Sequence, residues 1–145
     1  MSVRRCTQID SSYSSEWWSI RLPLGWSVSE ESDGVSFHRG AQGGVLRVSA
    51  VRKPDGRVVE SDFSDFIGEQ SQGCSTPQPT QAGPHFGFSR DCERDGTALA
   101  EWWLAHDSVL VYFTYSRKAD AGSEEFRDVR RIVESVRIGD PSSAL

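Results

Sequence analysis

The chain has 145 residues, of which 37% are hydrophobic and 26% charged, and this length and composition are typical of one globular domain with a core of its own. Its net charge is −5 and its arginines are scattered, which argues against a nucleic-acid-binding protein because such proteins usually carry a basic patch. We find neither a signal peptide nor an apolar run of about 18 residues, so we expect no membrane span and a cytoplasmic location.

The first half of the chain predicts four strands after a polar, serine-rich segment at residues 1–16, which we expect to be flexible. Short alternating runs are separated by turns rich in proline and glycine, such as Pro23-Leu24-Gly25 and Pro54-Asp55-Gly56. The predicted strands are residues 17–22, 26–30, 35–39 and 45–53.

The hydrophobic period then changes to that of a helix, which we predict at about residues 60–70 with Ser61 as its cap. Its apolar stripe would consist of Phe63, Phe66, Ile67 and Gln70. Residues 71–84 follow with three prolines and two glycines, and they predict a long mobile loop. Such a loop is either a plain linker or a functional segment.

Residues 86–117 predict three antiparallel strands and hold seven of the fifteen aromatic residues. Asp95-Gly96 is a preferred two-residue hairpin turn, and we expect a second turn at Asp107-Ser108. These turns pair Arg90 with Glu101 and Phe88 with Trp103 in the first hairpin. In the second hairpin they pair residues 100, 102, 104 and 106 with residues 115, 113, 111 and 109, respectively.

Alternation along these strands sorts the side chains onto two faces. The first is a core face with Ala100, Trp102, Leu104, Val111, Phe113 and Tyr115. The second carries Phe88, Trp103, Leu110 and Tyr112, with the Arg90/Glu101 pair among them. Both faces are too apolar for water, so the sheet is either covered on both sides or binds a partner with its second face. Those four apolar residues are the candidate partner-binding residues.

A second helix is predicted at about residues 123–135, capped by Ser123, with acidic residues at its start and arginines near its end. Its apolar stripe is Phe126, Val129, Ile132, Val133 and Val136. Residues 135–138 either continue this helix or form a short last strand. We interpret residues 17–138 as a single domain and residues 139–145 as a frayed tail.

Residues with reactive side chains form no recognisable site. We interpret Cys6, Cys74 and Cys92 as three free thiols, because their number is odd and their spacing fits no metal site. The three histidines are His38, His85 and His106, and His106-Asp107 resembles a polar turn more than an oriented base. Asp91, Glu93 and Asp95 are interpreted as a solvated strand edge. We predict no catalytic residue, metal or cofactor.

The order of elements, together with the opening motif Leu22-Pro23-Leu24-Gly25-Trp26 and the closing helix FRDVRRIVESVRI at residues 126–138, resembles the PsbP-like superfamily. Its members include an extrinsic photosystem II subunit, the Ran nucleotide-release factor and DcrB-type bacterial proteins. The resemblance implies an α+β fold, an α/β/α sandwich with a central, mostly antiparallel sheet of six to seven strands and two main helices. Members of the superfamily have unrelated functions, mostly through binding other proteins, and none of their functional residues has a matching motif here.

We therefore predict a non-catalytic, protein-binding or chaperone-like accessory domain of bacterial type whose partner is another protein. The alternative is a small-ligand-binding protein or a small enzyme that uses a cleft beside residues 71–84.

Overall fold

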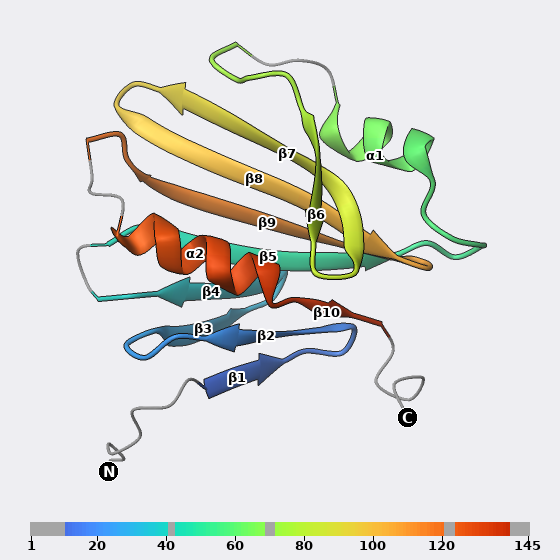
Figure 1. Ribbon diagram of the computed structural model, residues 1–145, viewed down its shortest axis with the longest axis horizontal. Helices are drawn as coiled ribbons and strands as arrows, with labels where there is room; N and C mark the ends of the chain where they lie inside the picture. The colour runs from blue at the N-terminus through green and yellow to red at the C-terminus, as the bar shows by residue number, and fades with distance from the viewer. Residues whose placement is uncertain (1–10, 41–42, 69–71, 121–123, 140–145) are drawn as a thin grey trace.

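The structure is a computed structural model that describes residues 11–40, 43–68, 72–120 and 124–139 (Figure 1). Within these ranges the chain forms a seven-stranded antiparallel sheet, a three-stranded antiparallel sheet and two helices. The large sheet has the order β3-β4-β5-β9-β8-β7-β6. Its strands are β3 (Ser27–Glu31), β4 (Gly34–His38), β5 (Val45–Arg52), β6 (Gln78–Ala82), β7 (His85–Arg94), β8 (Thr97–His106) and β9 (Val109–Lys118).

The predicted register of β7, β8 and β9 is confirmed. Phe88 pairs with Trp103 and Arg90 with Glu101 across the first hairpin, whereas Trp102 pairs with Phe113 across the second. Asp95 and Gly96 have φ angles of 53° and 79°, the left-handed conformation that a two-residue turn of this type requires. Asp107 has a φ angle of 52° in the second turn.

The first face of the sheet is the core face, and α2 (Glu124–Glu134) packs against it. The predicted stripe of this helix is confirmed, since Val129, Ile132, Val133 and Val136 are fully buried. Phe126 is half-buried and stacks on Tyr115, with 5.7 Å between ring centroids. Ser123, the predicted cap, lies outside the described residues.

A three-stranded sheet completes this layer with the order β1-β2-β10, and it adds Trp18, Ile20 and Leu22 to the same core. Its strands are β1 (Ser11–Ser14), β2 (Trp18–Leu22) and β10 (Arg137–Ile138). The segment predicted to be flexible thus contains a strand at residues 11–14, because β2 offers it a free edge. The open question at residues 135–138 is answered by a strand on the other edge of β2. Residues 1–10 and 140–145 lie outside the described residues.

The second face of the sheet is partly covered by α1 (Glu60–Ile67) near β7, as Figure 1 shows in green. Phe63 is the buried anchor of this helix, whereas Phe66 of the predicted stripe is exposed. The predicted cap is wrong: Val59 precedes the helix, and the Asp62 carboxylate accepts a hydrogen bond from the Val59 N–H at 2.8 Å. Gln70 lies outside the described residues.

The prediction of a mobile loop at residues 71–84 is wrong for the described part of that segment. Residues 78–82 form β6, an edge strand paired with β7, and an edge strand tolerates Pro79 because only one of its sides needs N–H donors. Upstream of β6, Cys74 and Cys92 form a disulfide, so these two cysteines are not the free thiols predicted. Sequence spacing could not reveal this pair because only the fold brings β7 beside residue 74. Cys6 lies outside the described residues.

The layers are therefore α1, the seven-stranded sheet, and a third layer made of α2 and the small sheet. This is an α+β sandwich with the predicted number of central strands and main helices. Among the described residues, neither helix is long and apolar enough to cross a membrane.

His85 is the first residue of β7, and its side chain links this strand to β10 within the core layer. It is buried, and its Nε2 accepts a hydrogen bond from the Ile138 N–H at 3.1 Å. Its ring lies 5.3 Å from that of His106. Burial, followed by the charges of His106 and Arg137, lowers the pKa of His85 below its ordinary value.

We expect this histidine to make the fold sensitive to mild acid. Because its pKa is lower in the folded state, its contribution is complete above about pH 6.5 and is lost as the pH falls through the folded-state pKa. The difference in the free energy of unfolding between wild type and His85→Asn should therefore shrink between pH 7.5 and pH 5, as measured by urea denaturation. The half-buried His38, replaced by Asn, serves as the control, and an equal pH dependence for both variants would contradict the assignment.

Candidate binding site on the second sheet face

The structure brings the four candidate partner-binding residues together beneath and beside α1. Trp103 and Leu110 are buried, whereas Phe88 and Tyr112 are half-buried. Phe63 of α1 covers Phe88, with 5.3 Å between ring centroids, and Trp103 stacks on Tyr112 at 5.2 Å. The second face is thus partly covered and partly open.

A cavity of about 370 Å³ lies where α1 does not reach the sheet. Its lining comes from α1, β5, β7, β8 and β9, so it lies beside the helix rather than beside β6. The apolar part of the lining is Ala50, Val51, Phe66, Ile67, Trp103 and Leu110, and the polar part is Ser49, Arg90, Glu101 and Tyr112.

A second hollow of about 260 Å³ shares Val51, Phe66 and Leu110 with the first. It continues toward the segment that leads from β5 into α1, where Lys53, Pro54 and Val58 line it. We call the two hollows together the α1 groove.

The polar floor of the first hollow is a buried ion pair between neighbouring strands. Arg90 Nε lies 2.8 Å from Glu101 Oε1, and the side chains are only 8% and 6% exposed. The Tyr112 hydroxyl donates to the other carboxylate oxygen, Glu101 Oε2, at 2.5 Å. Burial and this hydrogen bond to Glu101 raise the pKa of Tyr112 above its ordinary value. Both carboxylate oxygens are therefore engaged.

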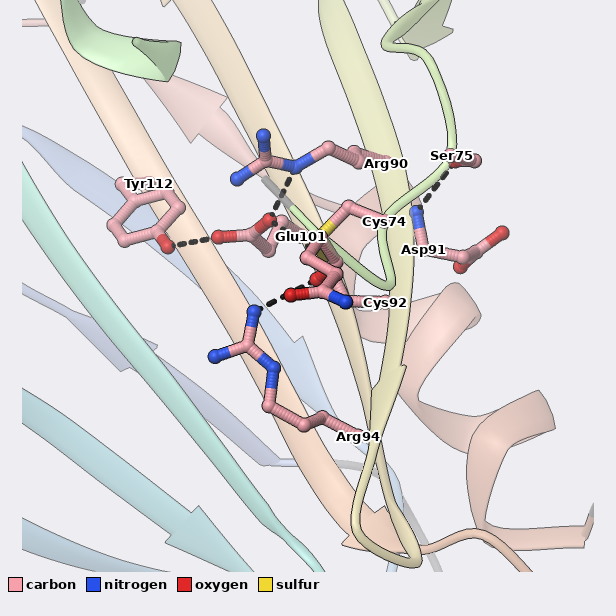
Figure 2. A network of polar contacts seen from close by, with 9 residues as sticks. Cys74, Ser75, Arg90, Asp91, Cys92, Arg94, Glu101 and Tyr112 are labelled. Carbon is pink, nitrogen blue, oxygen red and sulfur yellow. Dashed lines mark hydrogen bonds and ion pairs between the residues drawn. A yellow bond between two sulfur atoms is a disulfide. The ribbon is translucent and has the colours of Figure 1, made fainter. Parts of the chain in front are cut away.

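Arg90 itself is less completely satisfied. Its guanidinium carbon lies 5.3 Å from the centroid of the Trp103 ring, a cation–π contact. Its Nη1 atom is buried and has no hydrogen-bond partner within the part of the chain that the structure describes. Figure 2 shows both terminal nitrogens of Arg90 directed away from the Cys74–Cys92 disulfide.

The disulfide lies next to this ion pair and ties the segment before β6 to β7 (Figure 2). The sulfur of Cys92 is 3.7 Å from Glu101 Oε1. Two further contacts hold the same segment: Arg94 donates to the Gln72 carbonyl at 2.7 Å, and the Asp91 N–H donates to Ser75 Oγ at 3.1 Å. These contacts hold residues 72–75 against β7 next to Arg90.

The other sequence candidates lie elsewhere. His106 and Asp107 are exposed at their hairpin turn, with 3.9 Å between the imidazole nitrogen and the carboxylate. His85 and His106 approach each other, but among the described residues no group of three histidine, cysteine or acidic residues could hold a metal ion. Asp91, Glu93 and Asp95 are exposed on β7 and its turn.

Sequence reasoning paired Arg90 with Glu101 but did not recognise them as a buried site. The available signal was a pair of opposite charges flanked on the same face by Phe88, Trp103 and Tyr112, since large apolar neighbours shield such a pair from water. The open Nη1 and the disulfide left no signal in local sequence.

No protein-family model matches the chain, and no curated protein matches it. Solved structures, in contrast, do match the chain. The solution structure of cyanobacterial PsbP (CyanoP) from Synechocystis sp. PCC 6803 aligns with a TM-score of 0.62 and 14% identity, over 95% of this chain and 98% of that one. The chain has a PsbP-like fold.

A protein of Bacteroides thetaiotaomicron VPI-5482 gives a TM-score of 0.67 at 10% identity and covers 94% of this chain. The chain spans about half the length of that protein, since the match covers 50% of it. At these identities the similarity concerns the PsbP-like fold and not the activity.

The disulfide of this PsbP-like domain should contribute measurably to stability. A crosslink over a separation of 18 residues should raise the free energy of unfolding by about 3 kcal/mol. In a Cys6→Ser background, the denatured chain should have no thiol that reacts with Ellman's reagent before reduction. The variant Cys74→Ser/Cys92→Ser should have a free energy of unfolding that is lower by that amount in urea denaturation. A reductant should not affect the double variant further, and two reactive thiols before reduction would contradict the pairing.

Breaking the Arg90–Glu101 pair should cost far more than breaking a surface pair. Arg90→Met leaves a buried carboxylate without its cation and should lower the free energy of unfolding by about 3–5 kcal/mol in urea denaturation. Arg47→Met is the control, because its ion pairs with Glu31 and Asp33 are exposed and are worth about 0–1 kcal/mol each. Arg90→Met/Glu101→Gln should cost less than the sum of its single substitutions, whereas additive costs would contradict the coupling.

Proposed function

We propose that this PsbP-like domain is a non-catalytic module that binds a segment of another protein in the α1 groove. The observation that carries the proposal is the placement of exposed apolar side chains. Among the described residues, six large hydrophobic side chains are exposed: two of them, Val51 and Phe66, line the α1 groove, and two more, Val59 and Phe86, lie on or beside α1 outside that lining. Apolar side chains gathered on one surface are typical of a protein-interaction site, whereas scattered ones are not.

The shape of the groove favours a chain segment as the occupant. Its two hollows lie on either side of the shared residues Val51, Phe66 and Leu110, so consecutive side chains of one segment could fill both. Phe66 is 49% exposed and stands at the junction, where an aromatic anchor contributes most to binding.

The chemistry of the groove supports binding rather than catalysis. Asp62 and Asp65 line the second hollow, and the carboxylate in the floor of the first hollow is Glu101, whose two oxygens already accept hydrogen bonds. The raised pKa of Tyr112 keeps its hydroxyl protonated in the neutral range. Neither Glu101 nor Tyr112 is therefore free to take up a proton from a substrate at neutral pH.

A small-molecule ligand is the second candidate, and the size of the first hollow favours it. Its volume of about 370 Å³ falls within the range of about 300–1,000 Å³ found for small-molecule sites. In this case the second hollow would have no role.

A cytoplasmic location stays a prediction, and the disulfide weighs against it. Disulfides are rare in the reducing cytoplasm and persist in oxidising compartments. The partner would then be met in such a compartment.

The proposal predicts that one exposed phenylalanine controls partner capture. Phe66→Glu should reduce the amount of a stoichiometric protein partner recovered from lysate of the source organism by about tenfold or more, because a charge would replace an apolar anchor. Leu24→Glu is a matched control, since Leu24 is 54% exposed but lies on the turn between β2 and β3. Quantitative mass spectrometry of the captured proteins is the measurement. Equal capture by both variants, or no protein partner with wild type, would contradict the proposal.

A further inference from the structure

The unsatisfied guanidinium nitrogen of Arg90 specifies what the α1 groove recognises. Arg90 is 8% exposed, lines the first hollow and has a buried Nη1 atom without a partner among the described residues. A buried N–H donor without an acceptor carries a desolvation cost that a bound acceptor removes. An occupant that supplies an oxygen to this donor would remove that cost.

The rest of the guanidinium is held in place, so the donor is preorganised. The Nε–H bonds Glu101 on one side, and the Trp103 ring lies against the guanidinium at 5.3 Å. Glu101 in turn is held by Tyr112. Because Nη1 is buried, a ligand oxygen reaches it only when a side chain that covers it moves, whereas Glu101, Trp103 and Tyr112 can keep their places, which limits the entropic cost of binding.

The charge balance indicates which acceptor fits. Arg90 and Glu101 form a neutral pair, so a carboxylate at Nη1 would add an uncompensated negative charge close to Glu101 in a poorly hydrated site. An uncharged carbonyl oxygen satisfies the donor without that charge. The net charge of the chain, −5, also disfavours a negatively charged ligand.

The walls indicate what must lie beside that carbonyl. Ala50, Ile67 and Leu110 line the hollow with aliphatic surface, and Trp103 adds an aromatic wall. We infer that the hollow holds one apolar side chain of the partner segment while Arg90 Nη1 donates a hydrogen bond to an adjoining backbone carbonyl. This inference rests on the proposed function and adds the group that the groove recognises.

Capped amino acids test the inference on the full chain without the natural partner. N-acetyl-leucinamide offers an apolar side chain and uncharged carbonyls, N-acetyl-leucine adds a carboxylate at pH 7.5, and N-acetylglycinamide lacks the side chain. Binding is followed by two-dimensional NMR through the Arg90 Nε–H and Trp103 Nε1–H signals. For a probe of this size we expect a dissociation constant on the order of millimolar for N-acetyl-leucinamide. The other two probes should bind about tenfold more weakly.

Arg90→Lys separates the hydrogen bond from the charge. Lysine keeps a cation opposite Glu101 but lacks the forked terminal nitrogens, so the affinity for N-acetyl-leucinamide should fall by about tenfold. The comparison of probes on wild-type protein does not depend on this variant folding. Equal or tighter binding of N-acetyl-leucine, or no saturable shift of the two signals, would overturn the inference.

The two proposals can fail separately. Capture of a protein through Phe66 without probe binding overturns the inference about Arg90 and leaves the proposed function intact. Probe binding with the expected order but without any captured protein overturns the proposed function and assigns the hollow to a small uncharged ligand.

Discussion

The register of the β7–β8–β9 meander is the constraint on which the rest of the structure depends. Antiparallel pairing alternates side chains between two faces, so a slip of one residue would move Phe113 and Tyr115 out of the core and bring Arg90 and Glu101 into it. The two turns prevent such slips: Asp95 and Gly96 adopt the left-handed conformation of a two-residue loop between β7 and β8, and Asp107 adopts it between β8 and β9. Everything that packs on the sheet follows from this alternation.

The two faces are then covered to different extents, and the difference creates the candidate site. On the core face, α2 and the three-stranded sheet together bury a continuous cluster whose members run from Trp18 to Ile138 along the chain. On the second face, α1 has eight residues and spans about 12 Å, whereas a ten-residue strand such as β8 spans about 34 Å. One short helix cannot cover three long strands, so the α1 groove remains open beside Phe66.

The buried ion pair and the disulfide show how this open face is kept in one arrangement. An ion pair among aromatic residues contributes little to stability by itself, because desolvation offsets much of the attraction. It does fix the geometry of the floor, since Arg90, Glu101 and Tyr112 bond one another across three adjacent strands. The disulfide at Cys92 anchors the segment before β6 on the same face. The result is a floor with a buried donor, Arg90 Nη1, that has no hydrogen-bond partner in the described chain.

Local sequence by itself determined seven of the ten strands in the described residues, both helices, the hairpin register and the division of the meander into two faces. These features depend on turn residues and on hydrophobic periods that act over a few residues, as at Asp95-Gly96 and along residues 126–136. Only the tertiary structure decided that residues 78–82 form an edge strand, that Cys74 meets Cys92, that Phe66 stays exposed and that Arg90 keeps an open donor. Each of these depends on segments far apart in the sequence, whose approach is set by the packing of whole layers. No local pattern carries that information.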